Sequence, residues 1–105
     1  MKQGWANKLA TGFTISGSPS GDKLASLQSL VTFSLQHGMI WTGYNRMPET
    51  NLGVSPALAK NQLGSFTGLM LQAANSAPDE AFSEGDTASA IDFGQRVSAV
   101  LQLMR

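Results

Sequence analysis

The sequence predicts an α/β domain organised around a parallel sheet. Two short apolar segments, residues 9–16 and 39–44, flank a segment with the periodicity of an amphipathic helix. A strand, a helix and a strand with short connections form a βαβ unit, whose right-handed crossover makes the two strands parallel. A second helical pattern follows, so the predicted order is β-α-β-α. The 105 residues are enough for one domain, residues 1–105.

The first strand is predicted over Leu9 to Ser16. This segment is short, apolar and partly β-branched or aromatic, and glycine and proline residues follow it directly. These features favour a buried strand over a helix. Gly12 lies inside this strand and Gly43 inside the next one. A glycine in a strand marks the close approach of a neighbouring backbone or of a ligand.

The first helix is predicted from one stripe of apolar residues at three- and four-residue spacings: Leu24, Leu27, Leu30, Val31 and Leu35. Lys23 lies off this stripe. The side chain of Ser20 or Asp22 can cap the start of the helix, and Gly38 can supply the left-handed residue after its end.

The second predicted strand covers residues 39–44. An irregular stretch with two prolines, residues 46–62, follows it. Connections of this length are uncommon in compact domains and are often functional. Residues 69–72 are interpreted as a short additional strand.

The second helix is predicted to begin after a polar loop at residues 75–82. Ser83 is the expected N-cap, with Asp86 three residues later in an aspartate version of the capping box. A second stripe then runs to the C-terminus: Ile91, Gly94, Val97, Leu101 and Met104. Gly94 costs roughly 1 kcal/mol relative to alanine, which close packing on a sheet would explain.

The predicted sheet has too few strands to cover itself. One edge of strand 9–16 lacks a partner, and Trp5, Phe13 and Trp41 need burial. We therefore expect another copy or a different chain to complete the sheet. The alternative is a compact monomer in which residues 69–72 and the long connection close the edge.

The composition excludes several classes of function. Seven basic and seven acidic residues give zero net charge without a basic cluster, which argues against nucleic-acid binding. Charged residues make up only 13% of the chain, against about 25% in typical domains, which favours a surface covered by another chain. The chain has no cysteine, so disulfides and cysteine-based metal or catalytic sites are excluded. With no apolar run near ~18 residues and no signal peptide, we expect a cytoplasmic protein that does not bind membranes.

Several separated motifs occur in a recognisable order. They are residues 8–22, the segment Gln36-His37-Gly38-Met39-Ile40-Trp41, the segment Asn61-Gln62-Leu63-Gly64-Ser65, and the segment Phe93-Gly94-Gln95-Arg96-Val97. This series resembles the C-terminal half of WrbA-type NAD(P)H:quinone oxidoreductases and related NADPH-dependent FMN reductases, which have the flavodoxin fold. The resemblance extends from about Trp5 to Val100.

The resemblance implies a partial flavodoxin-like fold, the C-terminal β-α-β-α portion of a doubly wound parallel sheet, with FMN at the carboxyl ends of the strands. Residues 9–16 and 39–44 would be the fourth and fifth strands. Residues 15–22 would be the third flavin loop, and His37 would lie near the flavin and the quinone site. The implied activity is that of an oxidoreductase using NAD(P)H and a quinone or a flavin. The implied cofactor-binding residues are Ile15, Ser16, Gly17, Ser18, Gly21 and His37.

The chain departs from the family pattern in what it lacks. No segment matches the phosphate-binding loop or the second flavin loop, and Pro19 and Ser20 stand where WrbA-type members have glycines. We therefore expect that the chain alone neither holds FMN in the usual way nor is competent as an enzyme. Its expected partner is an N-terminal half chain or a second copy.

Simpler interpretations stay open beside this one. The loop at residues 16–22 can be an ordinary strand-to-helix turn. From chemistry alone, His37 is a cation at a helix end. Two further functions are a non-catalytic truncated module that self-associates through its free sheet edge, and a small module binding another ligand, such as sulfate or a nucleotide, near Gly17. No catalytic residue is assigned. No metal site is expected either, because nothing spaces the acidic residues as metal ligands: Asp79, Glu80, Glu84 and Asp86.

Overall fold

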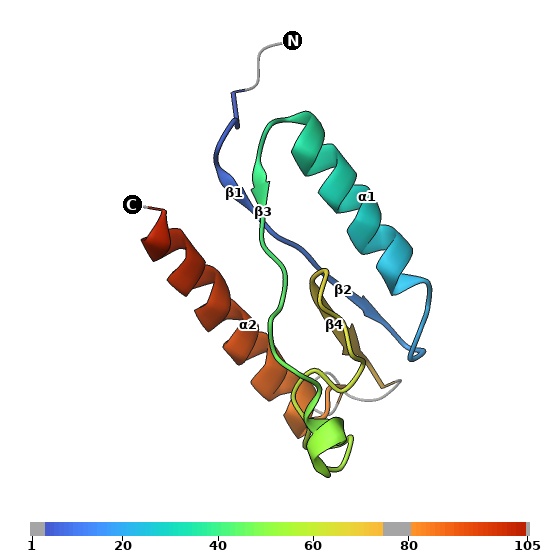
Figure 1. Cartoon of the computed structure of the whole chain (residues 1–105). Coiled ribbons are helices and arrows are strands. Elements are labelled where there is room, and N and C mark those ends of the chain that lie inside the picture. The colour runs from blue at the N-terminus through green and yellow to red at the C-terminus, as the bar shows by residue number, and fades with distance from the viewer. Residues whose placement is uncertain (1–3, 75–80, 105) are drawn as a thin grey trace.

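The computed structural model describes residues 4–74 and 81–104, and its elements alternate between strands and helices (Figure 1). In chain order they are β1 (Leu9–Ala10), β2 (Phe13–Ser16), α1 (Lys23–Gln36), β3 (Ile40–Trp41), the 3₁₀ helix η1 (Glu49–Leu52), β4 (Leu69–Gln72) and α2 (Glu84–Leu103). β1 pairs with β3 and β2 pairs with β4, and both pairs are parallel. The predicted α/β class with parallel strands is thus confirmed, as is the additional strand at residues 69–72.

β3 and β4 lie end to end along the same edge of the segment that contains β1 and β2. The carbonyl groups of Lys8 and Ala10 accept hydrogen bonds from the β3 region, and those of Gly12 and Ser16 accept from β4 and Ala73. All four acceptors are even-numbered. Alternate residues of a strand direct their backbone groups to opposite edges, so these four carbonyl groups lie on the same edge. β3 and β4 therefore pair with this edge as two parts of one partner strand, which residues 42–68 interrupt.

Two glycines allow this interruption. A Cβ atom on Gly12 would lie 2.9 Å from Leu30 Cδ1 and 3.0 Å from the Trp41 ring, and one on Gly43 would overlap the carbonyl oxygen of Phe66. Gly43 therefore marks the close approach of a neighbouring backbone, as predicted, whereas the atoms nearest to Gly12 belong to side chains. The prediction of one continuous strand over 9–16 was wrong, because the chain leaves strand geometry at residues 11 and 12, where the partner changes from β3 to β4. The strand predicted over 39–44 is likewise reduced to Ile40–Trp41.

α1 does not bury the stripe that predicted it. Only Leu27 of that stripe is fully buried, whereas Leu24, Leu30 and Leu35 are exposed. Lys23, expected at the surface, is instead 1% exposed. Neither Ser20 nor Asp22 caps the helix with its side chain, and Asp22 itself has a left-handed backbone with φ of 54°. The left-handed residue predicted at Gly38 is confirmed, with φ of 71°.

α2 begins as predicted but buries a different face. The Ser83 hydroxyl accepts from the backbone N–H of Asp86 at 3.0 Å, which confirms the N-cap. The Asp86 carboxylate does not return to Ser83 and accepts instead from the backbone N–H of Gln72 at 2.9 Å. The buried positions of α2 lie on one side of its first half: Gly85, Asp86, Ser89 and Phe93. From the predicted stripe, Ile91, Gly94, Leu101 and Met104 are exposed.

Gly94 shows why the second stripe failed. A Cβ atom on Gly94 would meet nothing within 4 Å, so close packing does not explain this glycine. The close contact is made by Gly85, where an added Cβ atom would overlap the backbone of Ala59. The sequence predicted a packed glycine in this helix but at the wrong position.

The core lies between β4 and α2. It consists of Tyr44, Leu69, Leu71 and Phe93, and the rings of Tyr44 and Phe93 meet edge to face at 5.4 Å. Asp92 joins this core to the segment after β3. It accepts from the Tyr44 hydroxyl at 2.7 Å and receives a bidentate contact from Arg46 at 2.8 and 2.9 Å.

One face of β2 remains uncovered. Phe13 and Ile15 are 62% and 44% exposed, although their neighbours in register, Leu69 and Leu71, are buried under α2. Figure 1 shows α1 and α2 on opposite sides of the strands, with β4 beside α2. Within the described part of the chain, no strand pairs with the second edge of β2.

The two tryptophans differ in their environment. Trp41 is half-buried and donates through Nε1 to the carbonyl oxygen of Thr67 at 2.8 Å. Trp5 is 48% exposed and lies against the rings of Phe33 and His37. Most of the predicted polar loop at 75–82, with Asp79 and Glu80, falls outside the described residues. Among the helices that are described, none is long and apolar enough to cross a membrane.

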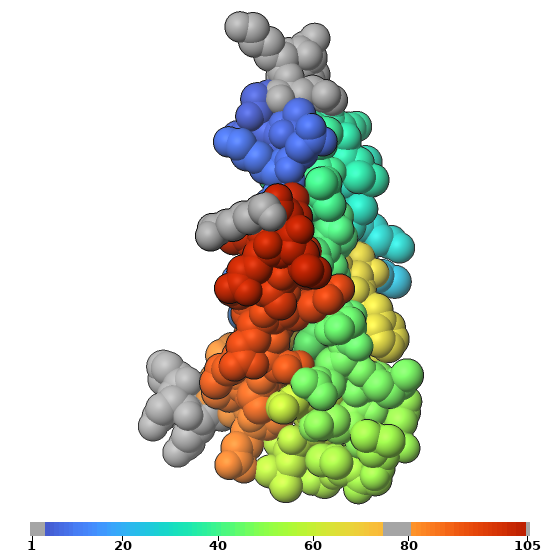
Figure 2. Space-filling model, turned by 60° about the vertical axis from the view of Figure 1, so that its left-hand side comes forward, coloured from blue at the N-terminus to red at the C-terminus, as the bar shows by residue number. Residues whose placement is uncertain are grey.

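The molecule is elongated. Its principal extents are 45 × 26 × 24 Å, and the space-filling view shows the C-terminal half of α2 along one side, below the N-terminal segment (Figure 2). The segment of residues 42–68, which connects β3 to β4, forms most of the end of the molecule that lies opposite the N-terminal segment. This end also carries the loop that follows β2.

Candidate functional site

The loop of residues 17–22 leaves the carboxyl end of β2 and enters α1. Because β2 and β4 are parallel, both strands end at this loop. All six loop residues are exposed at the edge of the sheet, although the carbonyl oxygens of Gly17, Ser18 and Ser20 accept internal hydrogen bonds. This is where open parallel sheets bind their ligands.

Internal hydrogen bonds fix the end of the loop that begins at Ser16. The Ser16 hydroxyl donates to the carbonyl oxygen of Ser18 at 2.8 Å, and its backbone carbonyl accepts from Ala73 at 2.9 Å. Lys23 Nζ donates to Ser16 Oγ at 2.5 Å and to the Ser18 carbonyl at 2.6 Å. The Ser16 hydroxyl is therefore engaged inside the protein.

The two glycines of the predicted site differ in what they require. Gly21 has φ of 53°, and a Cβ atom there would overlap the Ser16 hydroxyl. A side chain at this position would be strained by its backbone conformation and would displace Ser16. At Gly17 the nearest atom to an added Cβ would be the Ala73 carbonyl oxygen at 3.7 Å, so a small side chain fits there.

Lys23 is a site residue that the apolar pattern did not reveal. Burial lowers the pKa of its ammonium group, and the nearby Asp86 carboxylate partly opposes this effect. A lysine in the first turn of a helix also faces the positive end of the helix dipole. A basic residue at a predicted helix start, directly after Gly21 and Asp22, was the signal available in the sequence.

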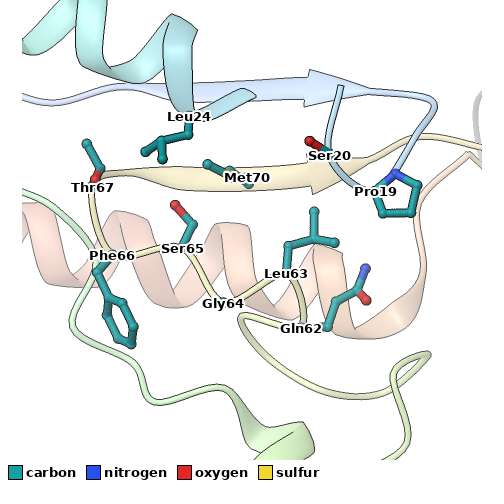
Figure 3. Close-up of a pocket in the computed structure, with 10 residues that line it drawn as sticks. All are labelled: Pro19, Ser20, Leu24, Gln62, Leu63, Gly64, Ser65, Phe66, Thr67 and Met70. Carbon is teal, nitrogen blue, oxygen red and sulfur yellow. The ribbon is translucent and has the colours of Figure 1, made fainter. Parts of the chain in front are cut away.

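An open hollow of about 630 Å³ lies beside the loop (Figure 3). Pro19 and Ser20 border it from the loop, Leu24 from α1 and Met70 from β4, and residues 62–67 form the remaining wall. This volume is within the range of small-molecule sites. The predicted site residues Ile15, Ser16, Gly17, Ser18 and Gly21 do not line the hollow themselves, but the loop that they form borders it.

Buried hydrogen bonds fix the wall at residues 62–67. The Asn61 side chain accepts from the backbone N–H of Ser65 at 3.0 Å and donates to the Arg46 carbonyl at 2.7 Å. The Ser65 hydroxyl donates to the Gly68 carbonyl at 2.7 Å. Of this preformed wall, only Gln62 belongs to the connection at residues 46–62 that was expected to be functional.

The structure does not bring His37 together with the loop. His37 follows the last residue of α1, and the loop precedes the first, so the 14-residue helix separates them by about 20 Å. The His37 ring packs on Phe33 at 4.6 Å and on Trp5 at 5.0 Å. Its part in flavin binding stays a prediction, and one ligand seated at the loop of the same chain would not reach it.

Among residues 4–74 and 81–104, no group of three or more histidine or acidic side chains is arranged to hold a metal ion. Asp86 and Asp92 serve internal contacts instead.

A comparison with known proteins finds a flavodoxin. The chain is similar to flavodoxin FldP of Pseudomonas aeruginosa (strain UCBPP-PA14), with 34% identity over 98 residues. The matched region covers 93% of this chain and 53% of FldP, so the chain spans about half the length of this curated relative. No family model and no solved structure matches the chain. The similarity supports the flavodoxin-fold family, and the parallel strands are consistent with that fold.

Proposed function

We propose that this chain is part of an FMN-binding flavoprotein and that the loop at residues 16–21 lies along the edge of the isoalloxazine ring. The observation that carries the proposal is an exposed strand-to-helix loop at the carboxyl ends of two parallel strands, in a chain similar to a flavodoxin. In flavodoxin-like sheets FMN binds at this end of the strands.

The chemistry of the loop suits the electron-rich side of a flavin. Exposed backbone N–H groups and the positive end of α1 favour carbonyl oxygens or negative charge. The ammonium group of Lys23 lies directly behind the loop. The neighbouring hollow offers apolar contacts from Leu24 and Met70 to a planar ring.

The residues fit the ring of FMN rather than its phosphate. Gly17 leaves the loop backbone open, and the left-handed Gly21 completes the turn without a side chain. In the described part of the chain we assign no group that would hold the phosphate. FMN supplies hydride and electron transfer when bound, while the protein binds, orients and tunes it.

The finer proposal is an NAD(P)H-dependent quinone or flavin reductase of the WrbA type. It is supported by the order of the motifs quoted above. On this proposal an N-terminal half chain supplies the phosphate-binding segment, and the assembled protein is cytoplasmic. The activity belongs to that assembly, and this chain contributes the loop and no catalytic residue.

Flavin titration tests the proposal. We expect the chain alone to quench the fluorescence of FMN and of riboflavin with dissociation constants within about threefold of each other, because only the ring is held. Adding a chain that carries the phosphate-binding segment should tighten FMN binding selectively.

Matched glycine variants complete this experiment. Gly21→Val should weaken binding about tenfold, because it distorts the loop. Gly94→Ala, at an open position on α2, should leave the affinity unchanged. If neither flavin responds to the chain, with or without a complementary chain, the proposal is wrong.

The second candidate function is self-association through the open edge of β2. The exposed Phe13 and Ile15 lie beside this unpaired edge, and an exposed strand edge with apolar side chains is a template for pairing with another strand. A second copy is the occupant that we propose here, because the low charge of the chain offers little repulsion between copies.

Sedimentation velocity distinguishes this candidate. The chain should sediment as a dimer at micromolar concentration, and Phe13→Lys should convert it to a monomer. Ile91→Lys is the matched control, because Ile91 and Phe13 are almost equally exposed, at 61% and 62%, but Ile91 lies on α2. A chain that is strictly monomeric before any substitution would rule out self-association.

A further inference from the structure

The ammonium group of Lys23 occupies a place that local chemistry disfavours. Lys23 is 1% exposed as a residue and lies in the first turn of α1, so its charge bears the cost of burial and of the helix dipole together. Natural sequences break such local rules chiefly at functional or strained positions. The unfavourable burial of the Lys23 charge therefore has to be offset by other interactions.

The contacts of Lys23 show what compensates the cost. Its Nζ donates to two acceptors on the same turn, the Ser16 hydroxyl at 2.5 Å and the Ser18 carbonyl at 2.6 Å. Hydrogen bonds from charged donors are about twice as strong as neutral ones. Lys23 therefore closes residues 16–18 against the start of α1.

A second buried charge balances the first. Asp86 is 2% exposed and acts electrostatically on Lys23, while its carboxylate accepts from the backbone of Gln72. The Gln72 side chain reaches the Gly17 carbonyl at 3.5 Å. The ends of β2, β4, α1 and α2 thus meet beneath the loop through Lys23, Asp86 and Gln72.

We propose that Lys23 is the positioning residue of the ligand loop: it holds residues 16–18 in the shape that receives the flavin edge and places a positive charge behind it. This inference rests on the proposed function for its ligand, but the shape of the loop is a property of the free chain. Lys23 does not touch the ligand and is not a catalytic residue.

Amide hydrogen exchange of the free chain tests the positioning role. Lys23→Met preserves the length of the side chain and removes the charge. We expect exchange of the amides at positions 23 and 73, which donate to the carbonyl groups of Ser20 and Ser16, to accelerate at least about tenfold, since two charge-assisted hydrogen bonds that fix this turn are lost. Exchange in the second half of α2 should accelerate less than this and reports any global loss of stability, because the variant leaves the buried Asp86 carboxylate without its opposing charge. Lys8→Met, at an exposed position, should alter neither.

Flavin affinity gives the second readout. If the unmodified chain binds riboflavin, Lys23→Met should weaken binding about tenfold and Lys8→Met should not. Equal affinity of Lys23→Met and the unmodified chain would overturn the proposal, as would unchanged amide exchange at positions 23 and 73. If the unmodified chain binds no flavin, with or without a complementary chain, the proposed function fails, while the exchange measurement still decides the role of Lys23.

Ser16→Ala keeps the test decisive if Lys23→Met does not fold. It removes one acceptor of Lys23 and leaves the charge in place. The amides at positions 23 and 73 should exchange faster in Ser16→Ala than in the unmodified chain, and an unaltered rate would overturn the proposal.

Discussion

Gly85→Ala is expected to lower the free energy of unfolding by about 3 kcal/mol, because α2 has no room for a methyl group at this position. An added Cβ atom would lie 2.7 Å from Ala59 N and from Leu58 C, and it would overlap Ala59 O. These neighbours are backbone atoms, which cannot move aside as a flexible side chain would. The Gly85 backbone N–H also donates to the Ala57 carbonyl at 2.9 Å, so a displaced helix start would lose this contact. Urea unfolding followed by circular dichroism measures the effect.

Gly94→Ala is the matched control in the same helix. Its added methyl group would meet nothing within 4 Å, so only helix propensity changes. We expect a gain of about 1 kcal/mol. The opposite signs of the two variants test how α2 is docked on residues 57–59. Similar effects of both substitutions would contradict this docking.

Asp92→Ala is expected to cost roughly 2–3 kcal/mol, because it removes the acceptor shared by Tyr44 and Arg46. Tyr44 is 2% exposed, so its hydroxyl would be left buried without this partner. The exposure of Arg46 keeps the loss below that of a fully buried pair, since its side chain is 40% accessible. A double-mutant cycle with Tyr44→Phe should show coupling, and strictly additive effects would count against the contact.

The same network predicts an acid dependence of stability. Hydrogen bonds from Arg46, reinforced by Tyr44, lower the pKa of Asp92 from 3.8 to about 2, against the opposing effect of burial. The group therefore stabilises the fold fully above pH 3.8, and this stabilisation is lost as the pH falls towards 2. It amounts to at most about 2 kcal/mol, because water screens the exposed Arg46. The difference in unfolding free energy between the unmodified chain and Asp92→Asn should shrink between pH 6 and pH 2.

Sequence patterns correctly predicted those features that depend on only a few adjacent residues. The Ser83 cap, the left-handed Gly38 and the strand at 69–72 each depend on a few adjacent residues, and all three are present. The split of the first strand could not be predicted in this way. It results from pairing with two segments that are distant in sequence, Ile40–Trp41 and Leu69–Gln72.

Both helix faces were predicted from the assumption that apolar stripes turn inward. Leu24, Leu30 and Leu35 remain exposed, while Lys23 and Asp86 are buried. Charged side chains are buried only where they have a hydrogen-bond or ionic partner. Here the partners come from other elements: Lys23 donates to the Ser16–Ser18 turn, and Asp86 accepts from the backbone of Gln72. Periodicity within one helix carries no information about such partners.

The candidate site was predicted in part. The strand-to-helix loop at residues 16–22 stands at the carboxyl end of β2, as the sequence indicated. His37 was grouped with it by resemblance but lies at the other end of α1. Lys23 and the wall at residues 62–67 were not assigned to the site, because only the folded arrangement places them against the loop.

Mapping of riboflavin binding by amide chemical shifts locates the flavin on the chain most directly. With the ¹⁵N-labelled chain, we expect the largest saturable shifts at the amides of Gly17, Ser18 and Gly21, followed by residues 63–67 across the hollow. Saturable binding with its largest shifts around His37 or along α2, and none at residues 17–21, would contradict a flavin seated at the end of β2.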